Sequence, residues 1–177
     1  LNLVFYFQVH QPYRLKHYSA LEIGKNHDYF DHKLNEQVIH KVADKCYLPT
    51  NQLMLDLIKK HKGKFKIAYS VTGVAIEQFK LYRPEVLDSF KALAETGCVE
   101  FIGETYYHSL SMLYDTEEFL EQVDMHRKLM QREFNFYTKT FRNTELIYQD
   151  KLSDLIYETE GFSTILTEAV DRILGWR

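Results

Sequence analysis

Five short runs of β-forming residues alternate with helical patterns along the chain, and this alternation constrains the fold more than any other feature. The runs lie at residues 1–10, 64–71, 99–105, 138–144 and 162–168. Strands that are separated by helices pair in parallel, and the helices then cover the sheet. The sequence therefore predicts an α/β fold made of repeated strand–helix units.

Helical periodicity fills most of the segments between these runs. Residues that favour helix starts stand before several of the apolar patterns. The predicted helices are residues 33–46, a helix capped by Thr50 or Asn51, one with Pro84 at its first position, one starting at Asp115 or Thr116, and one between Tyr148 and Glu160. The polar stretch 14–32 has no period, so it is predicted to be a long loop.

Composition indicates a globular protein and excludes several partner classes. Hydrophobic residues make up 45% and charged residues 27% of the 177 residues, which is enough apolar material for one core. Lys and Arg are scattered and the net charge is −3, so nucleic acid is not an expected partner. No apolar run approaches the length of a membrane span. The two cysteines, Cys46 and Cys98, form no disulfide framework, and together with the lack of a signal peptide they favour a cytoplasmic location.

The ends of the predicted strands carry the candidate site residues, because parallel β/α folds place working residues there. His10 and Gln11 follow the first run, Glu100 lies in the third, and Glu145 follows the fourth. Carboxylates that converge on one edge suit glycosyl transfer. Each of these residues also has a purely structural explanation. His10 can be a hydrogen-bonded structural residue, and Glu100 can face the solvent. Glu145 can be a surface residue whose charge is held by Arg142 or Asn143.

Metal-ligand spacing is absent from the sequence. No two of the eight histidines are spaced i, i+4, and H-E-x-x-H does not occur. The cluster of His27, Asp28, Asp31 and His32 is interpreted as part of the polar loop. We expect neither a metal ion nor a cofactor.

Three ordered segments carry a family resemblance over essentially the whole chain. VHQPYR (9–14), GCVEFIGETYYHSLS (97–111) and FRNTELIY (141–148) resemble the first three signature regions of glycoside hydrolase family 57, closest to its α-amylase group. TILTEAVDRILGWR (164–177) is similar to the segment after the third region. The resemblance implies an incomplete, seven-stranded TIM-like barrel, of which residues 1–177 would be the N-terminal part in a single catalytic domain.

The resemblance also implies a reaction and a set of roles. Members of the family cleave or transfer α-linked glucans with retention of configuration, so an α-glucan is the expected substrate. Glu145 matches the nucleophile, which forms a glycosyl–enzyme intermediate. His10 and Glu100 match residues that line the sugar site, and Gln11 and Arg142 join them as substrate-binding candidates.

Two positions depart from patterns found in some members. Gln8 replaces a second histidine, and Arg142 replaces a substrate-facing tryptophan, which together favour an amylase over a transferase. The family's general acid is an Asp of a fourth region, downstream of the third, and no segment up to Arg177 matches that region. Asp171 is interpreted as part of the preceding segment. We therefore expect the 177 residues to be a fragment that is inactive alone.

Three alternatives remain open from the sequence. The missing acid motivates an amylase-like carbohydrate-binding protein without turnover. A 4-α-glucanotransferase of the same family is the second. A metal-dependent polysaccharide deacetylase is the third and ranks last, since it needs an Asp and two His around a metal ion.

Overall fold

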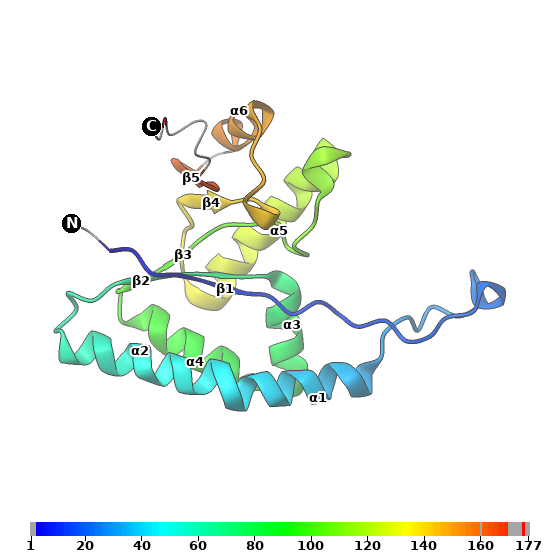
Figure 1. Ribbon diagram of the computed structural model, residues 1–177, viewed down its shortest axis with the longest axis horizontal. Coiled ribbons are helices and arrows are strands. Elements are labelled where there is room, and N and C mark those ends of the chain that lie inside the picture. Colours follow the sequence, from blue (N-terminus) through cyan, green and yellow to red (C-terminus); the bar gives the residue numbers. More distant parts are fainter. Residues whose placement is uncertain (1–2, 160, 170–174, 176–177) are drawn as a thin grey trace. The chain divides into compact units, whose positions relative to one another are not determined.

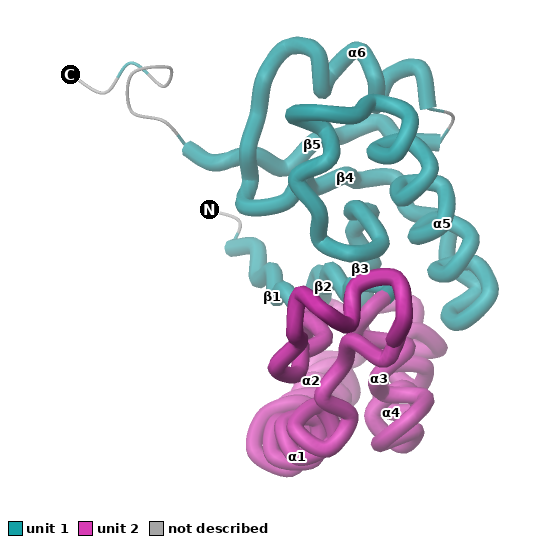
Figure 2. Tube along the Cα trace, turned by 90° about the vertical axis from the view of Figure 1, so that its right-hand side faces the viewer, with its two compact units in different colours: residues 1–9, 66–73, 99–177 teal, residues 10–65, 74–98 magenta. Residues whose placement is uncertain are grey.

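The computed structural model describes residues 3–159, 161–169 and 175, and strands alternate with helices along them in the predicted order (Figure 1). The chain divides into two compact units (Figure 2). Unit 1 comprises residues 1–9, 66–73 and 99–177, and unit 2 comprises residues 10–65 and 74–98. The five strands found among the described residues all belong to unit 1.

The strands of unit 1 are parallel, which confirms the predicted α/β class. β1 (Tyr6–Val9), β2 (Ile67–Val71) and β3 (Val99–Phe101) form one sheet in the order β1-β2-β3, and β4 (Thr140–Arg142) pairs with β5 (Thr164–Leu166). A parallel bridge between Gly103 and Phe141 connects the two sheets. Each strand lies inside its predicted run and is shorter than it.

The two faces of the three-stranded sheet differ in polarity. Side chains that are paired across a parallel sheet point to the same side, and successive ones alternate. Tyr69 contacts Phe7 with ring centroids 5.7 Å apart, and Phe101 stacks on Phe134 at 4.4 Å. The opposite face is polar, and there the hydroxyl groups of Tyr6 and Ser70 lie 2.8 Å apart. The face away from the stacked rings is therefore the one that can carry a polar site.

Two helices complete unit 1 around an apolar core. Asp115 caps α5 (Thr116–Phe134) by accepting hydrogen bonds from the backbone N–H groups of Glu117 and Glu118, as predicted. α6 (Asp150–Glu158) follows β4. The buried core that these elements share consists of Met112, Phe119, Val123, Phe141, Leu152 and Ile156. Burial of these rings and aliphatic chains is the main stabilising contribution here.

Unit 2 is helical, and one of its helices starts at a different residue from the one that the sequence predicted. α1 (His32–Val42) continues through a π-helical turn (Ala43–Tyr47) into α2 (Leu48–Lys60), and α2 packs against α4 (Pro84–Glu95) (Figure 1). The predicted helix start at Thr50 or Asn51 is therefore wrong. Asn51 is buried within α2 and donates a hydrogen bond to Ser89 Oγ at 2.8 Å, so tertiary contact uses the side chain that resembled a cap. Pro84 occupies the first position of α4 as predicted.

The sequence did not reveal α3 (Gly73–Tyr82). The residues buried along it are Gly73, Val74, Ala75, Ile76, Gln78 and Phe79. A helix that is buried on most sides lacks the one-sided apolar stripe by which surface helices are recognised.

The predicted loop at 14–32 is confirmed as mostly irregular. It contains a short 3₁₀ turn (Ala20–Glu22) and an antiparallel bridge between Leu15 and Phe30. Asp28 pairs with Lys16 at 2.6 Å, and Asp31 caps α1 by accepting from the N–H of Leu34 at 2.9 Å. The acids of this cluster therefore have structural partners.

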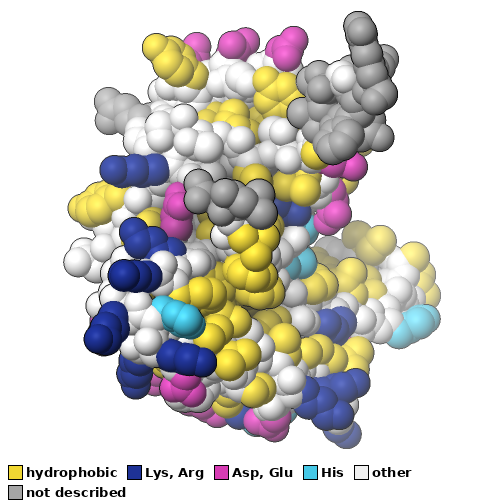
Figure 3. All heavy atoms as spheres, turned by 60° about the vertical axis from the view of Figure 1, so that its left-hand side comes forward, with side chains coloured by type: hydrophobic (Ala, Val, Ile, Leu, Met, Phe, Trp, Pro, Cys, Tyr) yellow, Lys and Arg dark blue, Asp and Glu magenta, His cyan; other side chains and the backbone are white. Residues whose placement is uncertain are grey.

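Hydrophobic side chains are exposed at the start of the chain. β1 is an edge of its sheet, and Leu3, Val4 and Phe5 are 76%, 79% and 45% exposed. Figure 3 shows exposed hydrophobic side chains gathered on the face that it draws. None of the helices in the described ranges is both long enough and apolar enough to cross a membrane.

Truncation of Phe119 to Ala should destabilise unit 1. Phe119 is fully buried and its ring centroid lies 5.9 Å from that of Phe141. Loss of such a ring leaves a cavity, so we expect the free energy of unfolding to fall by about 3–5 kcal/mol. Urea unfolding followed by circular dichroism measures it. Tyr114→Ala is the control, because Tyr114 is 85% exposed. Equal losses in both variants would contradict the assignment of this core.

Candidate active site

Glu145 lies just beyond β4, in a turn with unusual backbone geometry. β4 ends at Arg142, whereas the predicted strand 138–144 extends two residues further towards the C-terminus. Thr144–Leu146 form one 3₁₀ turn instead. Glu145 and Leu146 have φ angles of 54° and 59°, which non-glycine residues rarely adopt. The Glu145 side chain is 71% exposed, so its carboxylate is hydrated and available to a ligand.

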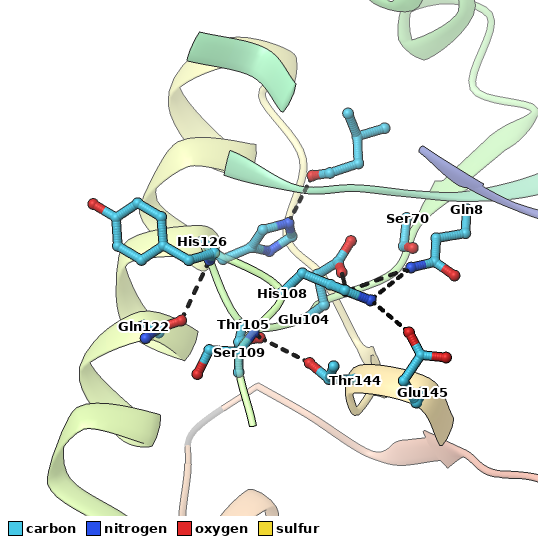
Figure 4. Close-up of polar contacts among 12 residues, drawn as sticks. Gln8, Ser70, Glu104, Thr105, His108, Ser109, Gln122, His126, Thr144 and Glu145 are labelled. Atoms are coloured by element: carbon cyan, nitrogen blue, oxygen red, sulfur yellow. Dashed lines mark hydrogen bonds and ion pairs between the residues drawn. The ribbon is translucent and has the colours of Figure 1, made fainter. Parts of the chain in front are cut away.

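His108 connects this carboxylate to a buried one (Figure 4). His108 Nε2 lies 3.1 Å from Glu145 Oε1, and His108 Nδ1 lies 3.3 Å from Glu104 Oε2. The amide nitrogen of Gln8 at the end of β1 lies 3.2 Å from His108 Nε2. The Glu104 side chain is fully buried, whereas that of His108 is 9% exposed. One imidazole therefore lies between a core acid and a surface acid.

The loop after β3 holds His108 through buried polar groups. Thr105 Oγ1 accepts from the N–H of Ser109 at 2.9 Å and lies 3.2 Å from Thr144 Oγ1. The His108 backbone also has a positive φ of 58°. Because Thr105 and Thr144 are buried, this contact fixes the loop after β3 against the turn that carries Glu145.

The two acids determine the protonation of His108. Burial by itself would lower the pKa of His108, but hydrogen bonds to the carboxylates of Glu104 and Glu145 outweigh it, and the pKa is raised above its ordinary value of 6.5. The Arg142 guanidinium opposes this rise. A raised pKa stabilises the fold fully below pH 6.5, and this contribution is lost as pH rises through the folded-state pKa.

Arg142 belongs to the same polar cluster. It is 4% exposed, and its Nε and Nη1 atoms have no hydrogen-bond partner within the described residues. Its charge acts on Tyr6 and on His108. The sequence suggested Arg142 or Asn143 as the residue that holds the charge of Glu145, but the carboxylate contacts His108 instead. The Asn143 side chain donates a hydrogen bond to the Ile147 carbonyl at 3.0 Å.

Glu100 lies on β3 between two buried neighbours. Val99 and Phe101 are buried, whereas Glu100 is exposed and accepts a hydrogen bond from Thr140 Oγ1 at 2.6 Å. It is thus on the polar face of the sheet with Tyr6, as the register of the strands requires. The structure records no contact between Glu100 and Glu145.

His10 and Gln11 belong to unit 2 and follow β1 directly. His10 is partly buried. Gln11 Nε2 donates to the Tyr47 hydroxyl at 3.1 Å, and Gln11 Oε1 accepts from Arg14 Nη2 at 2.9 Å. Both ends of the Gln11 amide are therefore engaged within unit 2.

Sequence reasoning gave no role to Glu104 or His108. Both lie in the segment GETYYHS, and their spacing of four residues was a signal that could have indicated a pair. A third buried group, His126, donates from Nε2 to the Val71 carbonyl at 2.9 Å, and burial lowers its pKa. His126 is thus a neutral core residue.

Metal ligands were also sought in the described part of the chain. Within residues 3–159 and 161–169, no three His, Cys, Asp or Glu side chains are arranged to hold a metal ion. Asp171 lies outside the described residues.

A family model matches nearly the whole chain, and a curated relative and solved structures are similar to it. The model of the family described as glycosyl hydrolase family 57 matches residues 4–177. A protein of Methanocaldococcus jannaschii named "Putative alpha-amylase" is 48% identical over 99% of this chain, and the chain spans 37% of that relative. The 4-alpha-glucanotransferase of Thermococcus litoralis has a similar structure over 93% of this chain and 22% of its own, with a TM-score of 0.69 at 18% identity. The alpha-amylase AmyC of Thermotoga maritima gives a TM-score of 0.62 at 16% identity, over 93% of this chain and 39% of its own.

The contact with His108 predicts how the imidazole titrates. NMR of the labelled imidazole should give a pKa above 6.5 in the wild type. In Glu145→Gln the pKa should fall, because one of the two carboxylates that favour the charged ring is removed. Glu121→Gln on the exposed side of α5 is the control and should leave the titration unchanged. A wild-type pKa below 6.5 would contradict the described geometry.

Proposed function

The chain belongs to glycosyl hydrolase family 57, and from its site we propose that the protein that contains it is a retaining glycoside hydrolase acting on α-glucans, with Glu145 as the nucleophile. The observation that carries the proposal is the exposed Glu145 carboxylate at a strand end, hydrogen-bonded to His108 at 3.1 Å. A carboxylate in that position is accessible and oriented.

The proposed reaction proceeds in two steps. A Glu145 oxygen attacks the anomeric carbon, the bond from that carbon to the leaving glycosidic oxygen breaks, and the leaving oxygen takes a proton from a general acid. Water then attacks the glycosyl ester, transfers a proton to the same acid–base residue and releases Glu145 as a carboxylate. We assign the acid–base role to the downstream Asp that the family resemblance implies, because no described carboxylate besides Glu145 is both exposed and in contact with this cluster.

The substrate class rests on the family and on its relatives. The 48% identical relative carries an amylase name, and this chain spans 37% of its length, so the activity of the whole protein is inferred. Within the site, we propose that Glu100 and Arg142 contact sugar hydroxyls on the polar face of the strands. The substrate-binding roles of His10 and Gln11, which belong to unit 2, are proposed from the family resemblance alone. Metal-dependent deacetylation is not proposed, since it needs a ligand group that we do not find among the described residues.

The strand pairing supports the proposed barrel. The bridge between Gly103 and Phe141 adds β4 beside β3, which gives the parallel order β1-β2-β3-β4-β5. Successive parallel strands in chain order form the wall of a β/α barrel. We propose that residues 1–177 are part of one such catalytic domain.

Glu145→Gln in the full-length protein tests the nucleophile. Loss of a covalent nucleophile should lower kcat by about 10⁴-fold or more on starch and maltodextrins, while Glu121→Gln should retain wild-type turnover. The wild type with an activated glucosyl donor should yield a trapped glycosyl ester on the peptide that contains Glu145, detectable by mass spectrometry.

Two outcomes would overturn this proposal. Turnover by Glu145→Gln within a few-fold of wild type would remove Glu145 from the chemistry. Binding of maltodextrin without any turnover by the wild type would instead support a carbohydrate-binding protein.

A further inference from the structure

The exposed carboxylate of Glu145 and the buried carboxylate of Glu104 contact different nitrogens of the same imidazole, that of His108. His108 Nε2 contacts Oε1 of Glu145, and His108 Nδ1 contacts Oε2 of Glu104. The structure records no hydrogen bond to Glu145 Oε2 within the described residues. One carboxylate oxygen of Glu145 is therefore held, while the other faces outward on a side chain that is 71% exposed.

We propose that Glu104 and His108 are positioning residues that hold the Glu145 carboxylate through Oε1 and leave Oε2 to attack the anomeric carbon. This inference rests on the proposed role of Glu145 as the nucleophile. Glu104 orients the imidazole from the core, and His108 transmits that orientation to the surface carboxylate.

The charge state of the pair suits this role. Carboxylate oxygens only accept hydrogen bonds, so an imidazole between two of them donates from both nitrogens when it is protonated. Such charge-assisted hydrogen bonds are about twice as strong as neutral ones. His108 is only 9% exposed and Glu104 is fully buried, so water screens the hydrogen bond between them little and this bond holds the ring firmly.

The backbone around the pair is fixed on both sides. His108, Glu145 and Leu146 all have positive φ angles, a geometry that surrounding contacts must maintain. The buried contact between Thr105 and Thr144 joins the two segments directly. A rigid pair of loops limits the rotation of the Glu145 side chain, and orientation of this kind is worth orders of magnitude in rate.

The groups that face His108 come from four elements. Glu104 lies after β3, Glu145 in the turn after β4, Arg142 at the end of β4, and Gln8 on β1. Arg142 opposes protonation of His108, whereas the two carboxylates favour it. Removal of Glu104 thus leaves the imidazole with one carboxylate partner and the opposing guanidinium.

Glu104→Gln in the full-length protein is the principal test. It keeps the size of the side chain and removes its charge. We expect kcat to fall by about 10- to 100-fold with KM changed by less than about threefold, because alignment of the attacking oxygen is lost while sugar contacts persist. The alkaline limb of kcat/KM should move to lower pH, in parallel with the imidazole pKa measured by NMR.

His108→Gln is the second variant, and it decides the outcome if Glu104→Gln fails to fold. Gln can keep a donor near Glu145 but does not titrate, so kcat should fall and the part of the alkaline limb that follows His108 should disappear. Glu121→Gln and His61→Gln are the matched controls on exposed positions, and both should keep the wild-type kcat and pH profile.

The outcomes separate this inference from the proposed function. Wild-type kcat in folded Glu104→Gln and His108→Gln, with Glu145→Gln inactive, would overturn the positioning role and leave the nucleophile in place. A kinetic limb that stays fixed while the NMR pKa of His108 moves would also overturn it. Turnover by Glu145→Gln would instead refute the proposed function itself.

Discussion

The backbone pairing of Gly103 with β4 is the interaction on which the site depends. Gly103 donates its N–H to the Thr140 carbonyl at 2.8 Å and accepts from the N–H of Arg142 at 2.8 Å. A Cβ at residue 103 would lie 2.6 Å from the ring of Phe162, so no larger residue fits without displacement of that ring. These two hydrogen bonds align the ends of β3 and β4. The residues that follow each strand, Glu104 and Glu145, consequently reach a common imidazole.

Charge compensation allows the polar cluster to be buried beside an apolar core. A buried carboxylate is costly unless cations or donors face it. His108 contacts Glu104 directly at 3.3 Å, and its protonated ring supplies the compensating positive charge. The aromatic rings lie on the opposite face, where Phe101 stacks on Phe134 at 4.4 Å. Alternation along each parallel strand thus separates a packing face from a polar one, and the polar face carries the candidate chemistry.

The sequence predicted those features that depend on neighbouring residues in the chain, such as helix starts, better than those that depend on tertiary contacts. Pro84 begins a helix because its fixed φ and missing N–H suit a first turn, and that prediction was confirmed. Asn51 resembled a cap but lies inside a continuous helix, because a tertiary hydrogen bond uses its side chain. Glu145 was identified from a family resemblance, but its contact with His108 was not predicted. That contact joins residues 37 positions apart in the chain, and it exists only because two strand ends are paired.

Burial distinguishes the two acids that share the imidazole. Glu104 and Glu145 make similar hydrogen bonds to His108, at 3.3 and 3.1 Å, so distance alone assigns neither role. The side chain of Glu104 is fully buried and cannot meet a sugar, whereas that of Glu145 is 71% exposed. Two carboxyl groups in different environments can take different tasks in one site. Accessibility therefore supports the proposal that Glu145 is the attacking group and that Glu104 is its support.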